Sequence, residues 1–191
     1  DDKVSPQIRR TASVLWQLYA GLTALEALAL MAAGLSPFDA VCHAMTTLAA
    51  GGFSPHPSSI AGYANPAVEW ILIVFMFIAG ANFALQYRAL SKRDARVLVV
   101  DEELRAYTGV VVVATVLLVG ALGLAGGVGI TIRQALFQVL SIVTTTGYAS
   151  TDFQLWNDQA KMVLLVLMFI GGCAGSASGG PKVVRHLLLA R

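Results

Sequence analysis

The sequence predicts an all-α membrane protein made of two tandem, parallel repeats. Each repeat has a transmembrane helix, a short re-entrant helix with an extended loop, and a second transmembrane helix. Hydrophobic residues make up 57% of the 191 residues and charged residues only 13%, so the charged surface of a soluble domain is missing. The chain also contains four long apolar stretches, and the short segment inside each half resembles its counterpart in the other half.

The four apolar stretches lie at about 12–33, 67–87, 106–128 and 162–175, and the last continues through small residues to about 190. A bilayer core of about 30 Å requires about 20 apolar residues in a helix, and the first three stretches meet that length. The fourth is shorter and is followed by glycines at 171, 172, 175, 179 and 180 and by Pro181. This composition predicts that the last helix is bent or broken.

Basic residues mark one side of the predicted membrane. Only two of the 13 Lys and Arg residues, Arg133 and Lys161, lie outside the beginning of the chain, the segment 88–105 and the end of the chain. Because cytoplasmic loops carry an excess of Lys and Arg, both termini of this chain and the 88–105 segment are predicted to be cytoplasmic.

The two halves are related by duplication. Residues 39–54 align with 134–149 at a constant offset of 95, so that Gly52 corresponds to Gly147. The following spans also align, with 76–80 matching 168–172 at an offset of 92. We therefore divide the chain into a first repeat, 1–97, and a second repeat, 98–191. Because both repeats enter and leave on the same side, the short helices expected at 38–48 and 133–143 dip into the membrane and return.

The extended segments offer backbone carbonyls and hydroxyls, and no carboxylate or histidine. They are Ala49, Ala50, Gly51, Gly52 and Phe53 in the first repeat, and Thr144, Thr145, Thr146, Gly147 and Tyr148 in the second. Carbonyl and hydroxyl oxygens can replace the hydration shell of a monovalent cation, and glycine allows the positive φ that turns successive carbonyls to one side. The short helices would direct their negative C-terminal ends toward the same place. These segments are therefore the predicted selectivity filter of a cation pore.

Four motifs resemble the third and fourth pore repeats of the Trk/Ktr/HKT potassium transporter superfamily, closest to the bacterial Trk-type membrane subunit. They are HAMTTLAAGGFS, FMFIAGANFALQYRAL, SIVTTTGYAST and FIGGCAGSASGGPKVVR, and the resemblance covers nearly the whole chain. It implies a potassium-channel-like fold and potassium as the transported ion, with no organic cofactor. Two features depart from the family pattern: Ala49 and Ala50 lack hydroxyls, and Pro181 stands where an aliphatic residue is more common.

The resemblance also implies a gate and partners. Gly80, Ala81 and Asn82 would form an intramembrane loop beneath the filter, and Arg185 would place a positive charge below it; the alternatives are a continuous helix with a packing notch and an arginine that reaches the cytoplasmic interface. A homodimer in the bacterial inner membrane, surrounded by lipid and controlled by a cytoplasmic nucleotide-binding ring, is implied, and no nucleic-acid partner is expected. Two repeats cannot encircle an ion, so a missing first half or further copies are expected.

Other polar residues have simpler explanations. Glu26, within the first span, is expected to be structural and to cap the neighbouring short helix. His43 is expected to be a packed, hydrogen-bonded residue, and Glu69 and Asp152 to be solvated near the external mouth, where they could also raise the local cation concentration. The two cysteines, Cys42 and Cys173, lack the spacing of a disulfide or metal site and are expected to pack as small residues.

Three alternatives to a selective potassium pore stay open from the sequence. One is a less selective potassium and sodium pore. A second is an intramembrane hydrolase that uses Ser176 or Ser178 with His43 or His186, although the serine spacing does not match Gly-x-Ser-x-Gly and no acid follows. A third is a structural bundle in which the small residues of 171–180 only allow close helix packing. We expect a transport protein and not an enzyme.

Overall fold

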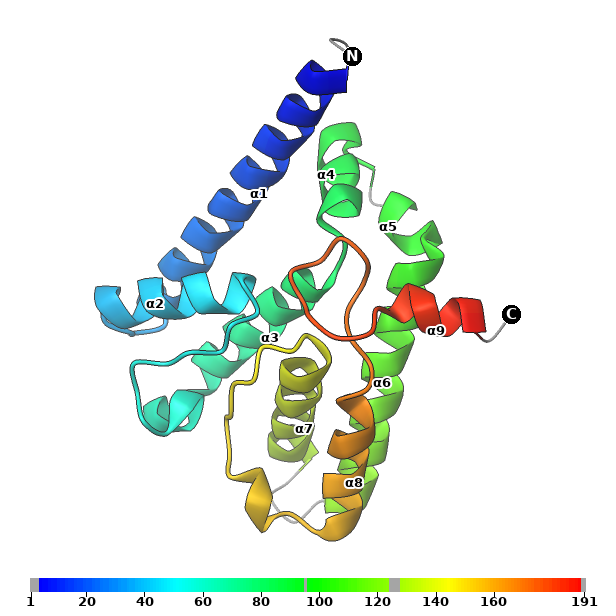
Figure 1. The fold of residues 1–191 in the computed structure, drawn as a ribbon. Helices are drawn as coiled ribbons and strands as arrows, with labels where there is room; N and C mark the ends of the chain where they lie inside the picture. The colour runs from blue at the N-terminus through cyan, green and yellow to red at the C-terminus, as the bar shows by residue number, and fades with distance from the viewer. Residues whose placement is uncertain (1–3, 95, 124–127, 190–191) are drawn as a thin grey trace.

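The computed structural model describes residues 4–94, 96–123 and 128–189, and these residues form helices joined by loops, without β-strands (Figure 1). The helices follow one another as α1 (Val4–Ala32), α2 (Pro37–Leu48), η1 (Ser59–Tyr63), α3 (Pro66–Gly80), α4 (Phe83–Lys92), α5 (Arg96–Val100), α6 (Glu102–Leu122), α7 (Val128–Val143), η2 (Phe153–Leu155), α8 (Asp158–Leu167) and α9 (Val183–Leu189), where η denotes a 3₁₀ helix.

Two helices of the described part are long and apolar enough to cross a membrane. They are α1, over Thr11–Ala32, and α6. A third crossing is possible if α3 and α4 count as one span, although these two helices meet at an angle of 98°. The predicted stretches 12–33 and 67–87 therefore correspond to α1 and to the bent pair. The third stretch begins earlier than expected, at Glu102, and its helix ends at Leu122; residues 124–127 of the stretch lie outside the described residues.

Polar caps determine where several helices begin. The side chain of Ser36 accepts a hydrogen bond from the backbone N–H of Asp39 at the start of α2, and Pro37 follows as the first helical residue. Such a cap satisfies a backbone donor that the helix itself leaves unpaired, and proline loses nothing at the first position. Asn65, Asn82, Asp101 and Asn157 cap α3, α4, α6 and α8 in the same way.

The two short re-entrant helices occupy the expected places. The prediction of 38–48 is matched by α2, which covers 37–48. The prediction of 133–143 is matched at its C-terminal end, but α7 already begins at Val128. In each repeat the short helix is followed directly by the extended segment singled out from the sequence.

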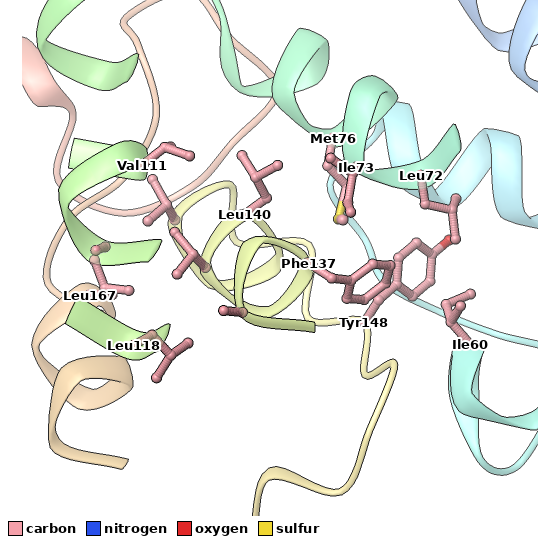
Figure 2. Close-up of a cluster of buried hydrophobic side chains, with 14 of the residues drawn as sticks. Ile60, Leu72, Ile73, Met76, Val111, Leu118, Phe137, Leu140, Tyr148 and Leu167 are labelled. Atoms are coloured by element: carbon pink, nitrogen blue, oxygen red, sulfur yellow. The ribbon is translucent and has the colours of Figure 1, made fainter. Parts of the chain in front are cut away.

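Helix α7 lies at the centre of the second repeat and carries much of the buried core. Figure 2 shows Phe137 and Leu140 of α7 between α3, which contributes Met76, and α6, which contributes Val111. All four side chains are buried. Because α3 belongs to the first repeat and α6 to the second, the core joins the two repeats through α7.

The fourth apolar stretch does not form one helix. Helix α8 ends at Leu167, residues 168–182 are non-helical, and α9 begins at Val183. The predicted break is therefore confirmed, but it is far longer than a bend. Hydrogen bonds close the base of this excursion, from Gly171 N–H to the Pro181 carbonyl at 2.7 Å and from Val183 N–H to the Gly172 carbonyl at 3.1 Å. We call residues 168–182 the 168–182 loop; its closed base is typical of an Ω-loop.

Candidate functional site

The extended segments 49–53 and 144–148 adopt the same backbone conformation. Ala50 and Thr145, which are equivalent in the two repeats, have φ values of 52° and 59°. The equivalent Gly52 and Gly147 have φ values of 66° and 83°. Positive φ is uncommon outside glycine, so its repetition at two pairs of positions shows that the duplication preserves a specific backbone shape.

Hydrogen bonds repeat with the same offset of 95. The hydroxyl of Thr46 donates to the carbonyl of Phe53 at 2.9 Å, and the hydroxyl of the equivalent Ser141 donates to the carbonyl of Tyr148 at 2.6 Å. Behind each segment a backbone bond recurs as well, from Ala50 to Thr47 and from Thr145 to Ile142, each at 2.9 Å. Each short helix therefore holds its own segment by a side-chain hydroxyl and by the helix end.

The two segments lie directly against each other. A Cβ atom added to Gly52 would collide with the carbonyl oxygen of Thr146 and lie 2.8 Å from its carbonyl carbon. Toward solvent, the N–H of Ala61 donates to the carbonyl of Ala149 at 3.0 Å, which also ties the repeats together. Glycine at position 52 is therefore required both by φ and by the close approach of the second segment.

Several carbonyl oxygens of these segments are left for a ligand. No described residue donates a hydrogen bond to the carbonyls of residues 50–52 or 145–147. In the second segment the hydroxyls of Thr144 and Thr146 also lie 2.7 Å apart. The C-terminal ends of α2 and α7 adjoin the segments and direct their partial negative charge toward them. Oxygen ligands and negative helix ends favour a cation.

Tyr148 joins the second segment to the helix of the first repeat. Its side chain is 1% exposed, and its hydroxyl lies 2.5 Å from the hydroxyl of Thr46 and 3.2 Å from Nδ1 of His43. Nε2 of His43 lies 3.3 Å from the Tyr63 hydroxyl. His43 is thus a packed and hydrogen-bonded residue, as expected. Since Thr46 also binds Phe53, the Tyr148 hydroxyl supports the extended segment of the other repeat.

The 168–182 loop contacts the second extended segment. The N–H of Gly179 donates to the hydroxyl of Thr145 at 2.6 Å. The loop also contacts the break between α3 and α4: Cys173 N–H donates to the Gly80 carbonyl at 2.9 Å, and Phe83 N–H donates to the Gly175 carbonyl at 3.1 Å. The break between α3 and α4 and the 168–182 loop, which interrupt the second spans of the two repeats, are therefore in contact. The loop also contacts the extended segment 144–148.

The break between α3 and α4 is short. Helix α3 ends at Gly80, Ala81 is extended, and Asn82 caps α4. The alternative of a continuous helix is therefore wrong. A Cβ atom at Gly80 would collide with the Tyr107 hydroxyl and lie 2.8 Å from the Thr144 side chain, so the missing side chain lets α3 approach the second extended segment closely. The structure brings Gly80, Ala81 and Asn82 together with Thr144 and the 168–182 loop.

Arg185 lies apart from these contacts. It sits in α9 with its side chain exposed, two residues after the buried Val183. The neighbouring Lys182 is instead bound to the loop, since its ammonium group donates to the carbonyl of Ser178. The two cations therefore have different surroundings, and only Lys182 is bound to the loop.

Two expectations about polar residues need correction, and the hydrolase alternative finds no support in the described residues. Glu69 is buried and not solvated: its carboxylate accepts a hydrogen bond from Arg133 at 2.8 Å and links α3 to α7. Glu26 does not cap α2, because Ser36 does. Ser176 and Ser178 bond to each other at 2.7 Å, and His43 is bound to two tyrosines, so the hydrolase arrangement is not formed among the described residues. Asp152 is exposed and caps η2.

The sequence interpretation missed two features of the site. One is the 168–182 loop as a docked element, although its glycines predicted the break. The other is Glu103, whose carboxylate accepts a hydrogen bond from the N–H of Ala174 at 2.6 Å and so ties the loop to the start of α6. An acidic residue in the first turn of a helix is common, so no sequence signal distinguished Glu103 from its neighbour Glu102.

Known proteins match this chain along its length. The Trk system potassium uptake protein TrkH of Escherichia coli K12 is 41% identical over 192 residues, which cover 99% of this chain and 40% of that protein. TrkG of the same organism is 34% identical over 195 residues. The crystal structure of the potassium transporter TrkH from Vibrio parahaemolyticus superimposes with a TM-score of 0.89 at 39% identity, covering 97% of this chain and 41% of that one.

The chain thus spans about 40% of the length of the curated relatives that it matches. The family described as "TrkH: Cation transport protein" matches residues 1–191. The agreement of sequence and fold along the whole chain shows that it belongs to the TrkH family of cation transport proteins.

Proposed function

We propose that this chain forms two walls of a potassium-selective pore in a potassium uptake system. Residues 49–53 form one wall and residues 144–148 the other. The observation that carries the proposal is the repeated backbone at these segments, with positive φ at equivalent positions and equivalent hydroxyl-to-carbonyl bonds. A duplicated structure that preserves such an uncommon backbone and leaves its carbonyls unbonded is suited to ion coordination.

Potassium is the ion that the relatives name. The similar proteins are described as potassium uptake proteins, and this chain shares their fold. Its own chemistry agrees, because the second wall adds threonine hydroxyls to the carbonyls, and such neutral oxygens suit a monovalent cation. The first wall has Ala49 and Ala50 at the equivalent positions, so the two walls are not identical in their ligands.

We assign the gate to two elements of this chain. The first is the break at Gly80, Ala81 and Asn82, and the second is Arg185. The 168–182 loop joins the break to Thr145, so a movement of the loop would reach the filter. Arg185 would oppose a cation electrostatically, since guanidinium stays charged at physiological pH.

Two walls require further walls to enclose an ion. Gly52 is covered by Thr146, whereas the equivalent direction at Gly147 meets no atom within 4 Å. Phe53 is 77% exposed, whereas the equivalent Tyr148 is buried. The two segments cover each other on the sides where they meet, which we call the inner edge. Their other sides, the outer edges, have no neighbour in this chain, and two further repeats would supply one for each. We propose that these come from a longer protein, and that the assembled protein is a homodimer controlled by a cytoplasmic nucleotide-binding ring.

We also propose that this chain lies in the bacterial inner membrane, where lipid surrounds it. The distribution of Lys and Arg supports a cytoplasmic position for both ends of this chain and for the segment that contains α4 and α5. We retain 1–97 and 98–191 as the two repeats. The filter segments then open toward the outer side, and α9 lies toward the cytoplasm.

Flux measurements test the proposal. The full-length protein that contains this chain, reconstituted in liposomes, should carry potassium or rubidium and reject sodium. Equal potassium and sodium fluxes would favour the less selective pore, and absence of flux with and without the regulatory partner would contradict transport. A purely structural bundle predicts the same absence.

A further inference from the structure

Glu26 is a carboxylic acid buried inside the first transmembrane helix. Its side chain is 0% exposed, and both of its oxygens are buried without a hydrogen bond from any described residue. This chain alone produces the burial, so a residue from another repeat or subunit has no access to the carboxyl group. A charged carboxylate without a donor is costly at such a place, and the position calls for an explanation within the chain.

The side-chain hydroxyl that interacts with this carboxyl is that of Thr47, on α2. Thr47 already donates its only hydroxyl proton to the carbonyl of His43, at 2.7 Å. It can therefore accept a hydrogen bond but has no proton left to donate. A carboxylate would face an oxygen lone pair, whereas a protonated carboxylic acid would donate to that oxygen.

Thr47 in turn adjoins the filter support. Its hydroxyl lies 3.3 Å from the Tyr148 hydroxyl, which lies 2.5 Å from Thr46. Thr46 donates to the carbonyl of Phe53. Thus the carboxyl in α1 is separated by one hydroxyl group from the tyrosine that holds both filter segments.

We propose that Glu26 is a positioning residue for the filter: as a neutral carboxylic acid it donates a hydrogen bond to Thr47 and fixes the Thr46–Tyr148 contact. This inference rests on the proposed potassium filter. It assigns to α1 a function beyond lipid contact, because α1 then sets how firmly the two filter segments are held together. Glu26 itself does not touch the ion.

Substitutions in the full-length protein separate this proposal from its alternatives. Glu26→Gln keeps a neutral donor of similar shape and should retain the wild-type potassium-to-sodium ratio. Glu26→Leu removes the donor and should lower the ratio by about tenfold, the effect of about 1.4 kcal/mol. Thr23→Val is the control in the same helix, because the Thr23 hydroxyl donates only to the Tyr19 carbonyl at 2.9 Å, and it should leave the ratio unchanged.

Two results would overturn the proposal. If Glu26→Gln loses selectivity as Glu26→Leu does, the negative charge is what matters. If Glu26→Leu keeps the wild-type ratio, Glu26 does not position the filter. A wild-type protein that carries no potassium would instead contradict the proposed function itself.

Infrared spectroscopy gives a measurement that does not depend on transport. The difference spectrum between the purified full-length wild type and Glu26→Gln, at neutral pH, should show loss of the carbonyl band of a protonated carboxylic acid. Loss of a carboxylate band alone would overturn the proposal even if the Glu26→Leu variant fails to fold.

Discussion

Gly52 occupies a position that only glycine fits well. Its φ of 66° is strained for other residues, and an added Cβ would collide with the Thr146 carbonyl. We predict that Gly52→Ser shifts this carbonyl and lowers the potassium-to-sodium permeability ratio by at least about tenfold, since strained backbone and a displaced ligand each cost about 1–3 kcal/mol. Permeability ratios from reversal potentials of the full-length protein measure the effect.

Two glycine controls sharpen this prediction. Gly147 shares the positive φ but has no atom within 4 Å of an added Cβ in this chain, so Gly147→Ser should lower the potassium-to-sodium ratio through strain at φ alone. Gly120 lies on the exposed face of α6 with nothing within 4 Å, and Gly120→Ser should behave like the wild type. Wild-type ratios in both filter variants would refute the filter assignment.

Tyr148 provides a test of the contact between the repeats. Tyr148→Phe keeps the buried ring and removes the hydroxyl that contacts Thr46 and His43. Because buried partners are then left unsatisfied, we expect a loss of about 1–3 kcal/mol in stability and a lower potassium-to-sodium ratio. Thermal unfolding and permeability ratios measure the two effects.

Tyr19→Phe is the matched control for Tyr148→Phe. The Tyr19 ring, in α1, packs on Phe83 of α4 and not on the proposed filter segments. The control should retain both stability and selectivity. An unchanged melting temperature and ratio in Tyr148→Phe would show that the hydroxyl contacts do not support the filter.

Among the elements, the 168–182 loop is tied to α6 by an acidic side chain. Glu103 accepts from Ala174 N–H at 2.6 Å, and a hydrogen bond to a charged group contributes about 1.5–3 kcal/mol. We predict that Glu103→Ala loosens the loop, speeds amide exchange at 171–178 and raises potassium flux without a regulator. Hydrogen exchange and liposome flux provide the measurements.

A hydroxyl group on the same helix supplies the comparison for Glu103→Ala. The Thr115 hydroxyl donates to the Val111 carbonyl within α6 at 2.7 Å, so Thr115→Val should leave loop exchange and flux near wild-type values. Faster exchange at 171–178 in both variants would mean that α6 as a whole is destabilised, and the specific role of Glu103 would be lost.

The sequence predicted best those elements that residues close together in the chain determine. The short helix expected at 38–48 begins with local features, Pro37 and the Ser36 cap. The break after Gly80 was implied by the family resemblance, with a continuous helix as the open alternative. The path of the 168–182 loop was beyond such local features, because its backbone is held by distant groups, including the carbonyl of Gly80 and the hydroxyl of Thr145.

The candidate site also has features that the sequence predicted and features that only the fold revealed. The extended segments 49–53 and 144–148 were singled out from their spacing, since duplication makes Gly52 and Gly147 visible in the sequence. Glu69 was assigned to solvent because its partner Arg133 is 64 residues away and lies on an element whose packing the sequence does not give. Charge pairs between distant helices therefore needed the fold, whereas the repeated backbone did not.

In the whole molecule, the two repeats share one core and one pair of filter segments. Phe137 and Leu140 of α7 pack against α3 of the first repeat (Figure 2), and Tyr148 reaches the helix α2. The inner edge is therefore fixed by many contacts, while Phe53 and Gly147 leave the outer edges open. Such a pair cannot slide without breaking buried contacts, so a conductance change is expected from the gate elements and not from relative motion of these two repeats.

The charge on α9 gives the prediction that concerns the conduction path as a whole. Arg185 is exposed on α9, which directly follows the 168–182 loop. If it faces the path below the filter, its fixed charge opposes every arriving cation. Arg185→Ala should then raise potassium flux in the absence of the regulator.

Lys182→Ala is the comparison for Arg185→Ala, since its ammonium group is bound to the Ser178 carbonyl inside the loop and is not available to the path. It should change resting flux little. Arg185→Lys keeps a positive charge and should stay close to the wild type, which separates charge from side-chain size. If Arg185→Ala conducts like the parent protein, Arg185 is an interfacial residue whose charge lies at the headgroups, and the break at Gly80, Ala81 and Asn82 is then the remaining gate element.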